Sequence, residues 1–190
     1  MSLLHTATRP QQFPFLTRHE FAASSALVLP RLHASGVEAK LLSSSADDDV
    51  ATGLDIRLAD EQEEAIVYTH IYILLSPVYE LPVLYFTSYL QYHEDDSIKY
   101  LSLLSDLLAH KVVHCPASDD AEEFVSGGTI SQCDHPIYPS RVCFFVHPCR
   151  TADVLREIDE DVDGGIATED YLPILLGIVG PLLGLSLRAP

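Results

Sequence analysis

Four strand-like segments follow one another between residues 37 and 90, and they limit the possible folds more than any other feature. Residues 37–41 and 54–58 alternate apolar and polar side chains, which is typical of half-buried strands. Residues 63–75 are apolar at both alternating sets of positions, as in a central strand covered on both faces. Residues 82–90 form an aromatic segment that begins with a proline. Because the connections are short, the sequence predicts an antiparallel four-stranded meander.

Helices are predicted before and after this meander. Residues 17–20 match a capping box, in which a threonine and a glutamate satisfy each other's backbone amides. This pattern predicts a helix that begins at Arg18 and ends near residues 30–33. Apolar residues at helical spacing predict a second helix over residues 95–110, with Asp96 as its cap.

The last third of the chain is predicted to contain one more strand and two helices. Residues 142–147 alternate like a strand, and Thr151 is expected to cap the helix that follows. A final helix is predicted to begin near residues 168–170. We therefore expect an α+β fold, an antiparallel four-stranded meander flanked by helices. A single domain is expected over residues 1–190, with residues 1–15 as a flexible N-terminus.

The charge of the chain excludes several partners. Asp and Glu number 28 against 11 Lys and Arg, so the net charge is −17, which disfavours binding to nucleic acid or to an anionic membrane. The N-terminus lacks the apolar core of a signal peptide, so we expect a cytoplasmic protein with free thiols. Residues 171–187 are apolar but short of the roughly 20 residues that span a bilayer. They predict a buried helix without stable membrane insertion.

The segment HPIYPSRVCFFVHPCRT, residues 135–151, raises the main chemical question, because its second His-Pro dipeptide precedes Cys149. Four interpretations compete: a metal site, a hydrolase nucleophile, a carrier thiol and an ordinary buried cysteine. A zinc site would use Cys133, His135, His147 and Cys149. Each pair of these ligands is separated by one residue, whereas structural zinc sites usually place about two to four residues between paired ligands. The spacing therefore disfavours zinc.

The hydrolase and structural interpretations stay open on residue chemistry alone. Several histidines can serve as a base, but no glycine-rich elbow or peptidase signature surrounds Cys149. Free cysteines in apolar strands are usually core residues, and this interpretation is applied to Cys115 and Cys143. Cys133 is left undecided, with a structural role preferred.

A carrier thiol fits the position of Cys149 best. The cysteine leaves a strand just before a helix begins, where the helix dipole favours negative charge on sulfur. Pro148 fixes its own φ and biases His147 toward an extended conformation, so the thiol is held rigidly.

At this point the sequence resembles a known family. HPIYPSRVCFFVHPCRT resembles the active-site signature of the autophagy ubiquitin-like conjugating enzymes, which carry a His-Pro-Cys motif. Thr151 lies two residues after the cysteine, and a threonine at this position resembles the signature of the branch that serves autophagy-related protein twelve. Residues 70–86 and 171–187 resemble the same branch. The likeness spans about residues 64–187, and the N-terminal quarter matches only in outline.

The resemblance implies a core like that of ubiquitin-conjugating enzymes, with an extra strand before a catalytic Cys149. It implies that the activating enzyme passes autophagy-related protein twelve to Cys149 as a thioester. A lysine of autophagy-related protein five then attacks this thioester without a separate ligase. No metal or other cofactor is expected.

One departure concerns the oxyanion that forms during transfer. Ubiquitin-conjugating enzymes carry His-Pro-Asn before the cysteine, and the asparagine amide is assigned to the oxyanion. Here an isoleucine follows the first His-Pro dipeptide, and the chain contains no Asn. Loss of such a donor costs on the order of 3 kcal/mol, so Gln132, Tyr138 or His135 is a candidate replacement. Tyr138 and His135 can equally shape the loop, and His147 is expected to be a fold element.

Two other functions remain as alternatives. One is a non-catalytic adaptor with the same fold, which would bind partners without forming a covalent adduct. The other is the autophagy branch that conjugates its cargo to a lipid head group, whose longer chain and membrane-sensing N-terminus are not seen here. For the preferred function we expect a cytoplasmic enzyme that its partners recruit to the preautophagosomal membrane.

Overall fold

The computed structural model describes residues 8–43, 51–114 and 129–187, so Cys115 lies outside the described residues. The elements in chain order are α1 (Arg18–Ala34), β1 (Glu38–Ser43), β2 (Ala51–Glu61), β3 (Ala65–Leu75), β4 (Pro82–Tyr92), β5 (Ile98–Leu101), α2 (Leu104–Ala109), β6 (Ile130–Asp134), β7 (Val142–Val146), α4 (Pro148–Asp161), α5 (Thr168–Val179) and the short 3₁₀ helix η1 (Gly180–Leu183).

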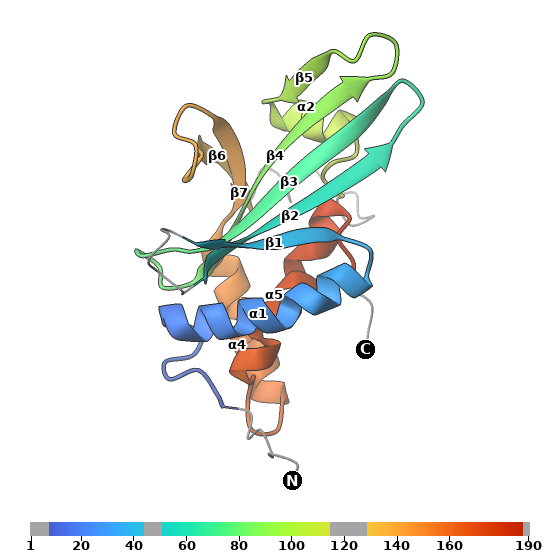
Figure 1. Cartoon of the computed structure of the whole chain (residues 1–190). Coiled ribbons are helices and arrows are strands. Elements are labelled where there is room, and N and C mark those ends of the chain that lie inside the picture. Colours follow the sequence, from blue (N-terminus) through green and yellow to red (C-terminus); the bar gives the residue numbers. More distant parts are fainter. Residues whose placement is uncertain (1–7, 44–50, 115–128, 188–190) are drawn as a thin grey trace.

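The strands form one antiparallel sheet in the order β1-β2-β3-β4-β7-β6, and β5 pairs with the distal part of β4 (Figure 1). The predicted meander is confirmed as β1 to β4. The sheet nevertheless has seven strands and not four. β7 is the predicted strand before Cys149, whereas β6 was not predicted. Its sequence, ISQCD, is too polar to read as a strand, and only Ile130 in it is fully buried.

The helix predicted over residues 95–110 is wrong in its first half. Asp96 has a positive φ of 55° and lies in the turn between β4 and β5, so it caps no helix. This turn reverses the chain and brings Leu101 opposite Ser88. Ile98 is 57% exposed and Leu108 is 38% exposed, so the apolar residues at helical spacing do not line one buried helix face. Within residues 95–110 only α2 is helical, because the pairing of β5 with β4 overrides the weak local preference for helix.

The predicted capping box opens α1. The Thr17 hydroxyl accepts the backbone N–H of Glu20, and the Glu20 carboxylate accepts the backbone N–H of Thr17. α1 and α5 lie together on one side of the sheet (Figure 1), where Phe21 and Tyr171 are fully buried. The Leu172 backbone amide donates to Ser24 Oγ and joins the two helices. These helices cover the inner face of the sheet and build the core.

The apolar segment at residues 171–187 begins in α5 and continues through η1. The side chains of Leu172, Leu175 and Leu176 are buried in the same core, as the sequence predicts. Across the described ranges, none of the helices combines the length and the apolar character needed to cross a bilayer.

The opposite side of the sheet, called the outer face here, is defined by one cross-strand row. This row consists of Lys40, Asp55, Tyr72, Tyr85 and Phe145, each opposite the next on neighbouring strands. Its β1–β2 end is charged: Asp55 is 5% exposed and pairs with Lys40 at 3.4 Å. Its β3–β7 end is aromatic. The outer face therefore changes from ionic to aromatic toward the hairpin that precedes Cys149.

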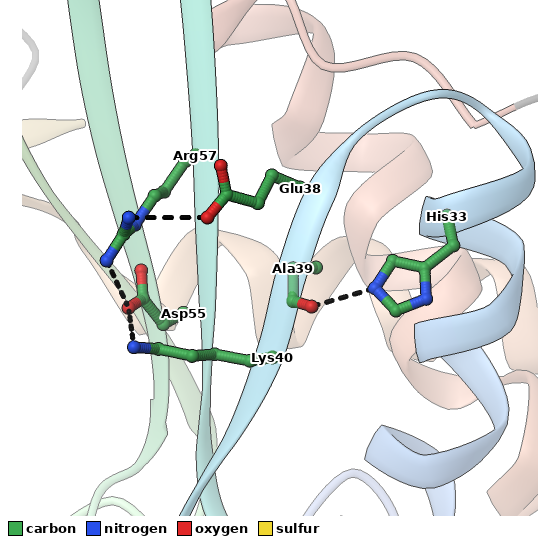
Figure 2. Close-up of polar contacts among 6 residues, drawn as sticks. All are labelled: His33, Glu38, Ala39, Lys40, Asp55 and Arg57. Carbon is green, nitrogen blue, oxygen red and sulfur yellow. Dashed lines mark hydrogen bonds and ion pairs between the residues drawn. The ribbon is translucent and has the colours of Figure 1, made fainter.

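Two further contacts stabilise the charged end of this face, and Figure 2 shows them. Arg57 forms ion pairs with Asp55 at 3.9 Å and with Glu38 at 3.3 Å. On the helix side of β1, His33 Nε2 lies 2.8 Å from the carbonyl oxygen of Ala39 and links α1 to the strand.

Candidate active site around Cys149

Cys149 lies in the first turn of α4, immediately after β7 ends. Pro148 occupies the first helical position, where its missing N–H needs no helical partner, and the Cys149 side chain is exposed. Helix α4 is 14 residues long, so its N-terminus carries an appreciable partial positive charge. The sulfur is thus accessible and rigidly placed where negative charge is stabilised.

His147 is the N-cap of α4. Its Nδ1 atom accepts the backbone N–H of Cys149 at 3.3 Å. The imidazole ring lies near two aromatic rings, with centroid distances of 6.0 Å to Phe145 and 6.3 Å to Tyr79. Because Nδ1 is used to accept an amide proton, the geometry makes His147 a helix cap and not a base directed at the thiol.

Thr151 does not cap this helix, which corrects the sequence prediction. The helix begins three residues earlier, and Thr151 is buried inside it. Its hydroxyl donates to the carbonyl oxygen of Pro148 at 2.8 Å. Local reasoning favoured Thr151 because threonine is a common cap, whereas a histidine cap is easily overlooked. Thr151 therefore stabilises the same turn from inside the helix.

The first His-Pro dipeptide forms the turn that closes the β6–β7 hairpin. His135 is 2% exposed, and its Nδ1 atom accepts the backbone N–H groups of Ile137 at 3.1 Å and Tyr138 at 3.2 Å. Burial, followed by the nearby charge of Arg141, lowers the pKa of His135. The turn packs on the outer face, where the His135 ring lies 4.7 Å from that of Tyr72. Burial raises the pKa of Tyr72 to about 12.

The three candidates for oxyanion stabilisation do not lie beside the thiol. Gln132 is opposite Phe144, and its amide donates to the carbonyl oxygen of Ser102 at 2.8 Å. The turn that holds His135 and Tyr138 meets the start of β7, since the His135 amide donates to the Arg141 carbonyl. Cys149 follows the other end of β7. The structure therefore gives Gln132 and His135 structural contacts away from the sulfur.

Sequence reasoning missed the position of Tyr79. This residue belongs to the turn between β3 and β4, and its ring is 44% exposed beside His147. Ser76 Oγ accepts the backbone amides of Val78 and Tyr79, both at 3.3 Å, and so orders the turn. The sequence indicated a turn here, but only the pairing of β4 with β7 shows that this turn meets the cysteine-bearing end of the hairpin.

The zinc interpretation is not supported by the geometry. Cys133 and His135 lie at one end of the β6–β7 hairpin, while His147 and Cys149 follow the other end. Among the described residues, no three His, Cys, Asp or Glu side chains are grouped to hold a metal ion. Cys133 instead lies 3.4 Å from the sulfur of Cys143, which is fully buried as predicted.

The hydrolase interpretation also lacks its central contact. Within the described ranges of the chain, no side chain makes a hydrogen bond to the Cys149 sulfur, and His147 directs Nδ1 to a backbone amide. A nucleophile of the triad type needs a base within hydrogen-bonding reach of the thiol. An exposed cysteine without such a base fits a thiol that exchanges acyl groups with other proteins.

Comparison with solved structures identifies the fold. The chain is similar to the structure described as "Crystal structure of Autophagic E2, Atg10", with a TM-score of 0.52 and 17% sequence identity. The match covers 93% of this chain and 98% of that one. The fold is therefore similar to that of this autophagic E2.

The family follows from a second comparison. Residues 9–189 match the family model for the "Autophagocytosis associated protein, active-site domain", and the chain belongs to this family. No curated protein matches the chain. The protein is thus an autophagy E2-like protein, as its resemblance to the autophagy conjugating enzymes indicated.

Proposed function

We propose that this protein is a conjugating enzyme that accepts the ubiquitin-like autophagy-related protein twelve as a thioester on Cys149. It then transfers this modifier to a lysine of autophagy-related protein five. The observation that carries the proposal is the exposed Cys149 thiol, held in the first turn of α4 by Pro148 and the His147 cap. The family model and the similarity of the fold to the autophagic E2 Atg10 support this choice.

The chemistry needs two acyl transfers at one sulfur. First, Cys149 attacks the thioester carbonyl carbon of the modifier on its activating enzyme, and the thiol of that enzyme leaves. Second, a lysine amine attacks the new thioester, an isopeptide bond forms, and the Cys149 sulfur leaves. The N-terminus of α4 stabilises negative charge on the departing sulfur. The protein is thereby a transferase that requires no cofactor of its own.

Tyr79 is the side chain that we propose to contact the modifier's thioester. Its exposed phenol ring lies 6.3 Å from the ring of the His147 cap, and Ser76 holds its backbone amide. Replacement by phenylalanine keeps the ring packing and removes only the hydroxyl. If the hydroxyl stabilises the oxyanion, Tyr79→Phe slows transfer to lysine by about 10-fold or more while the protein remains folded.

The proposed partners are the activating enzyme, autophagy-related protein twelve and the acceptor, autophagy-related protein five. We propose that the enzyme works in the cytoplasm and that these partners recruit it to the preautophagosomal membrane. The net charge of −17 supports protein partners over direct binding to anionic lipid. A basic acceptor surface would be attracted by the same charge.

Reconstitution tests the function directly. The protein is mixed with activating enzyme, ATP and each autophagy modifier in turn, and the products are separated on a non-reducing gel. A reductant-sensitive adduct is expected with autophagy-related protein twelve. Cys149→Ser should give an adduct that resists reductant and hydroxylamine, because the bond is then an oxyester. Cys149→Ala should give none.

Matched controls locate the reacting sulfur. Cys133→Ser removes a different thiol and should leave adduct formation intact. An adduct that persists in Cys149→Ala, or disappears in Cys133→Ser, would contradict the assignment of Cys149. Preferential loading with the lipid-conjugated modifier would favour the other autophagy branch, and stable partner binding without any adduct would indicate an adaptor.

A further inference from the structure

The β6–β7 hairpin contains a pair of thiols that the proposed transfer reaction does not use. Cys133 on β6 and Cys143 on β7 are directly opposite each other, and their sulfur atoms are 3.4 Å apart. Directly opposed residues of an antiparallel pair have Cα atoms about 4.5–5.5 Å apart. This spacing falls within the range of about 4.4–6.8 Å found across disulfides.

We propose that Cys133 and Cys143 form a reversible dithiol–disulfide site that reacts with small-molecule disulfides of the glutathione class. The sulfurs need to approach by only about 1.4 Å to reach the bonded distance of about 2.0 Å. The strand register already aligns the two side chains, so the bond requires no change in the pairing of β6 with β7.

The burial of the two thiols sets the order of the reaction. Cys143 is 0% exposed, so an external disulfide cannot reach its sulfur, whereas Cys133 is partly exposed. Burial, together with the contact from Cys133, raises the pKa of Cys143 and keeps it a thiol. Cys133 is therefore the thiol at which an oxidant enters, and Cys143 is the one that resolves the intermediate.

The two steps balance as ordinary thiol–disulfide exchange. The Cys133 thiolate attacks one sulfur of the small disulfide, and a mixed disulfide forms as one small thiolate leaves. Cys143 then loses its proton and attacks the Cys133 sulfur, which releases the second small thiolate. Two protein thiols give up two electrons and two protons, and one small disulfide becomes two small thiols.

The position of the pair gives the bond a mechanical consequence. β7 pairs with β4 only at Phe144 and Phe145, and Figure 1 shows the β6–β7 hairpin diverging from the rest of the sheet. Among the described strands, β6 is the outermost on this side and pairs with β7 alone. A disulfide would therefore tie the peripheral strand to the strand that leads into α4.

Cys149 is separate from this site. It follows Cys143 by six residues, beyond the end of β7, and extended chain covers about 3.3 Å per residue. The pair can therefore be oxidised while the carrier thiol stays free. Oxidation of the pair can also be tested without modifier or activating enzyme, so the result does not depend on the proposed function.

The decisive variant is the full chain with Cys115→Ser and Cys149→Ser, which leaves only Cys133 and Cys143. This protein is incubated with glutathione disulfide, its remaining thiols are blocked with N-ethylmaleimide, and its intact mass is measured. We expect loss of both maleimide labels without a glutathione adduct, and full recovery of both labels after treatment with dithiothreitol.

Two matched variants complete the test. Adding Cys143→Ala removes the resolving thiol, so a stable glutathione adduct should accumulate on Cys133. Adding Cys133→Ser instead leaves only the buried thiol, which should stay unmodified. The proposal is overturned if the two-thiol protein accumulates a stable adduct, keeps both labels under excess oxidant, or forms disulfide-linked dimers on a non-reducing gel.

A second measurement addresses the effect on the hairpin. In the wild-type chain, oxidation should slow hydrogen exchange of the β6 backbone amides, because the outer strand can no longer open away from β7. The Cys133→Ser chain should show the same exchange rates with and without glutathione disulfide. Unchanged β6 exchange in an oxidised wild-type protein would rule out the clamping role.

Discussion

His135-Pro136 and His147-Pro148 lie at opposite ends of the β6–β7 hairpin, and both histidines use Nδ1 to accept backbone amides. His135 accepts two amides and is almost completely buried. His147 accepts one amide, stays partly exposed and stands next to the exposed Cys149 thiol. In both cases the ring must be unprotonated at Nδ1 to make the contact.

The difference between the two turns shows how one dipeptide serves two purposes. At the first, burial and two accepted amides make the histidine a structural centre of a closed turn. At the second, the chain continues into α4, so the same contact becomes a helix cap that orients a reactive side chain. A His-Pro sequence by itself therefore indicates a fixed turn and not a catalytic base.

The largest effect on stability is expected at the buried turn. His135→Ala leaves two backbone amides without their acceptor and should lower the free energy of unfolding by about 3 kcal/mol. His135→Asn supplies an oxygen near the position of Nδ1 and should recover more than half of this loss. Urea denaturation measures both values. Equal destabilisation by the two variants would show that ring packing, and not the accepted amides, is what matters.

A smaller effect is expected at the helix cap. His147→Ala should cost about 1 kcal/mol, and His147→Asn should restore most of it because asparagine is a strong N-cap. Thioester formation on Cys149 should survive in His147→Asn, since the ring is directed at an amide. If a stable His147→Asn protein cannot be loaded, His147 acts on the thiol and the two histidines differ more than the structure indicates.

Thr151 allows a finer test of the same helix turn. Thr151→Val removes the hydroxyl that donates to the Pro148 carbonyl and should lower the free energy of unfolding by roughly 0.5–1 kcal/mol. Thr151→Ser keeps the hydroxyl and serves as the matched control. Loading of Cys149 should change little in either variant, and a large loss in Thr151→Val alone would show that this hydroxyl serves the chemistry.

The smallest expected effect is on the pH dependence of stability. The pKa of His135 is lower in the folded protein than its ordinary value of 6.5, so below pH 6.5 the unfolded chain binds more protons. The stability that neutral His135 contributes to the folded protein is fully present above pH 6.5, and it is lost as the pH falls through the folded pKa. His135→Asn should therefore lose less stability than wild type between pH 7 and pH 5. Urea midpoints that fall by the same amount in both proteins over this pH range would contradict this prediction.

The sequence by itself determined those features that depend on residues close together in the chain. The capping box at Thr17, the alternation in β1 and β2, and the start of β4 at Pro82 all act within a few residues. The exposed cysteine after a rigid His-Pro dipeptide belongs to the same group. Periodicity and local backbone restriction suffice for these predictions.

Only the tertiary structure decided the features that depend on strand pairing. Residues 98–101 became a strand because they pair with β4, and the polar β6 exists because β7 pairs with it. The same pairing moved Gln132 away from the thiol, placed Cys133 against Cys143, and brought the Tyr79 turn to the helix cap. Register joins residues far apart in sequence, and no local pattern carries that information.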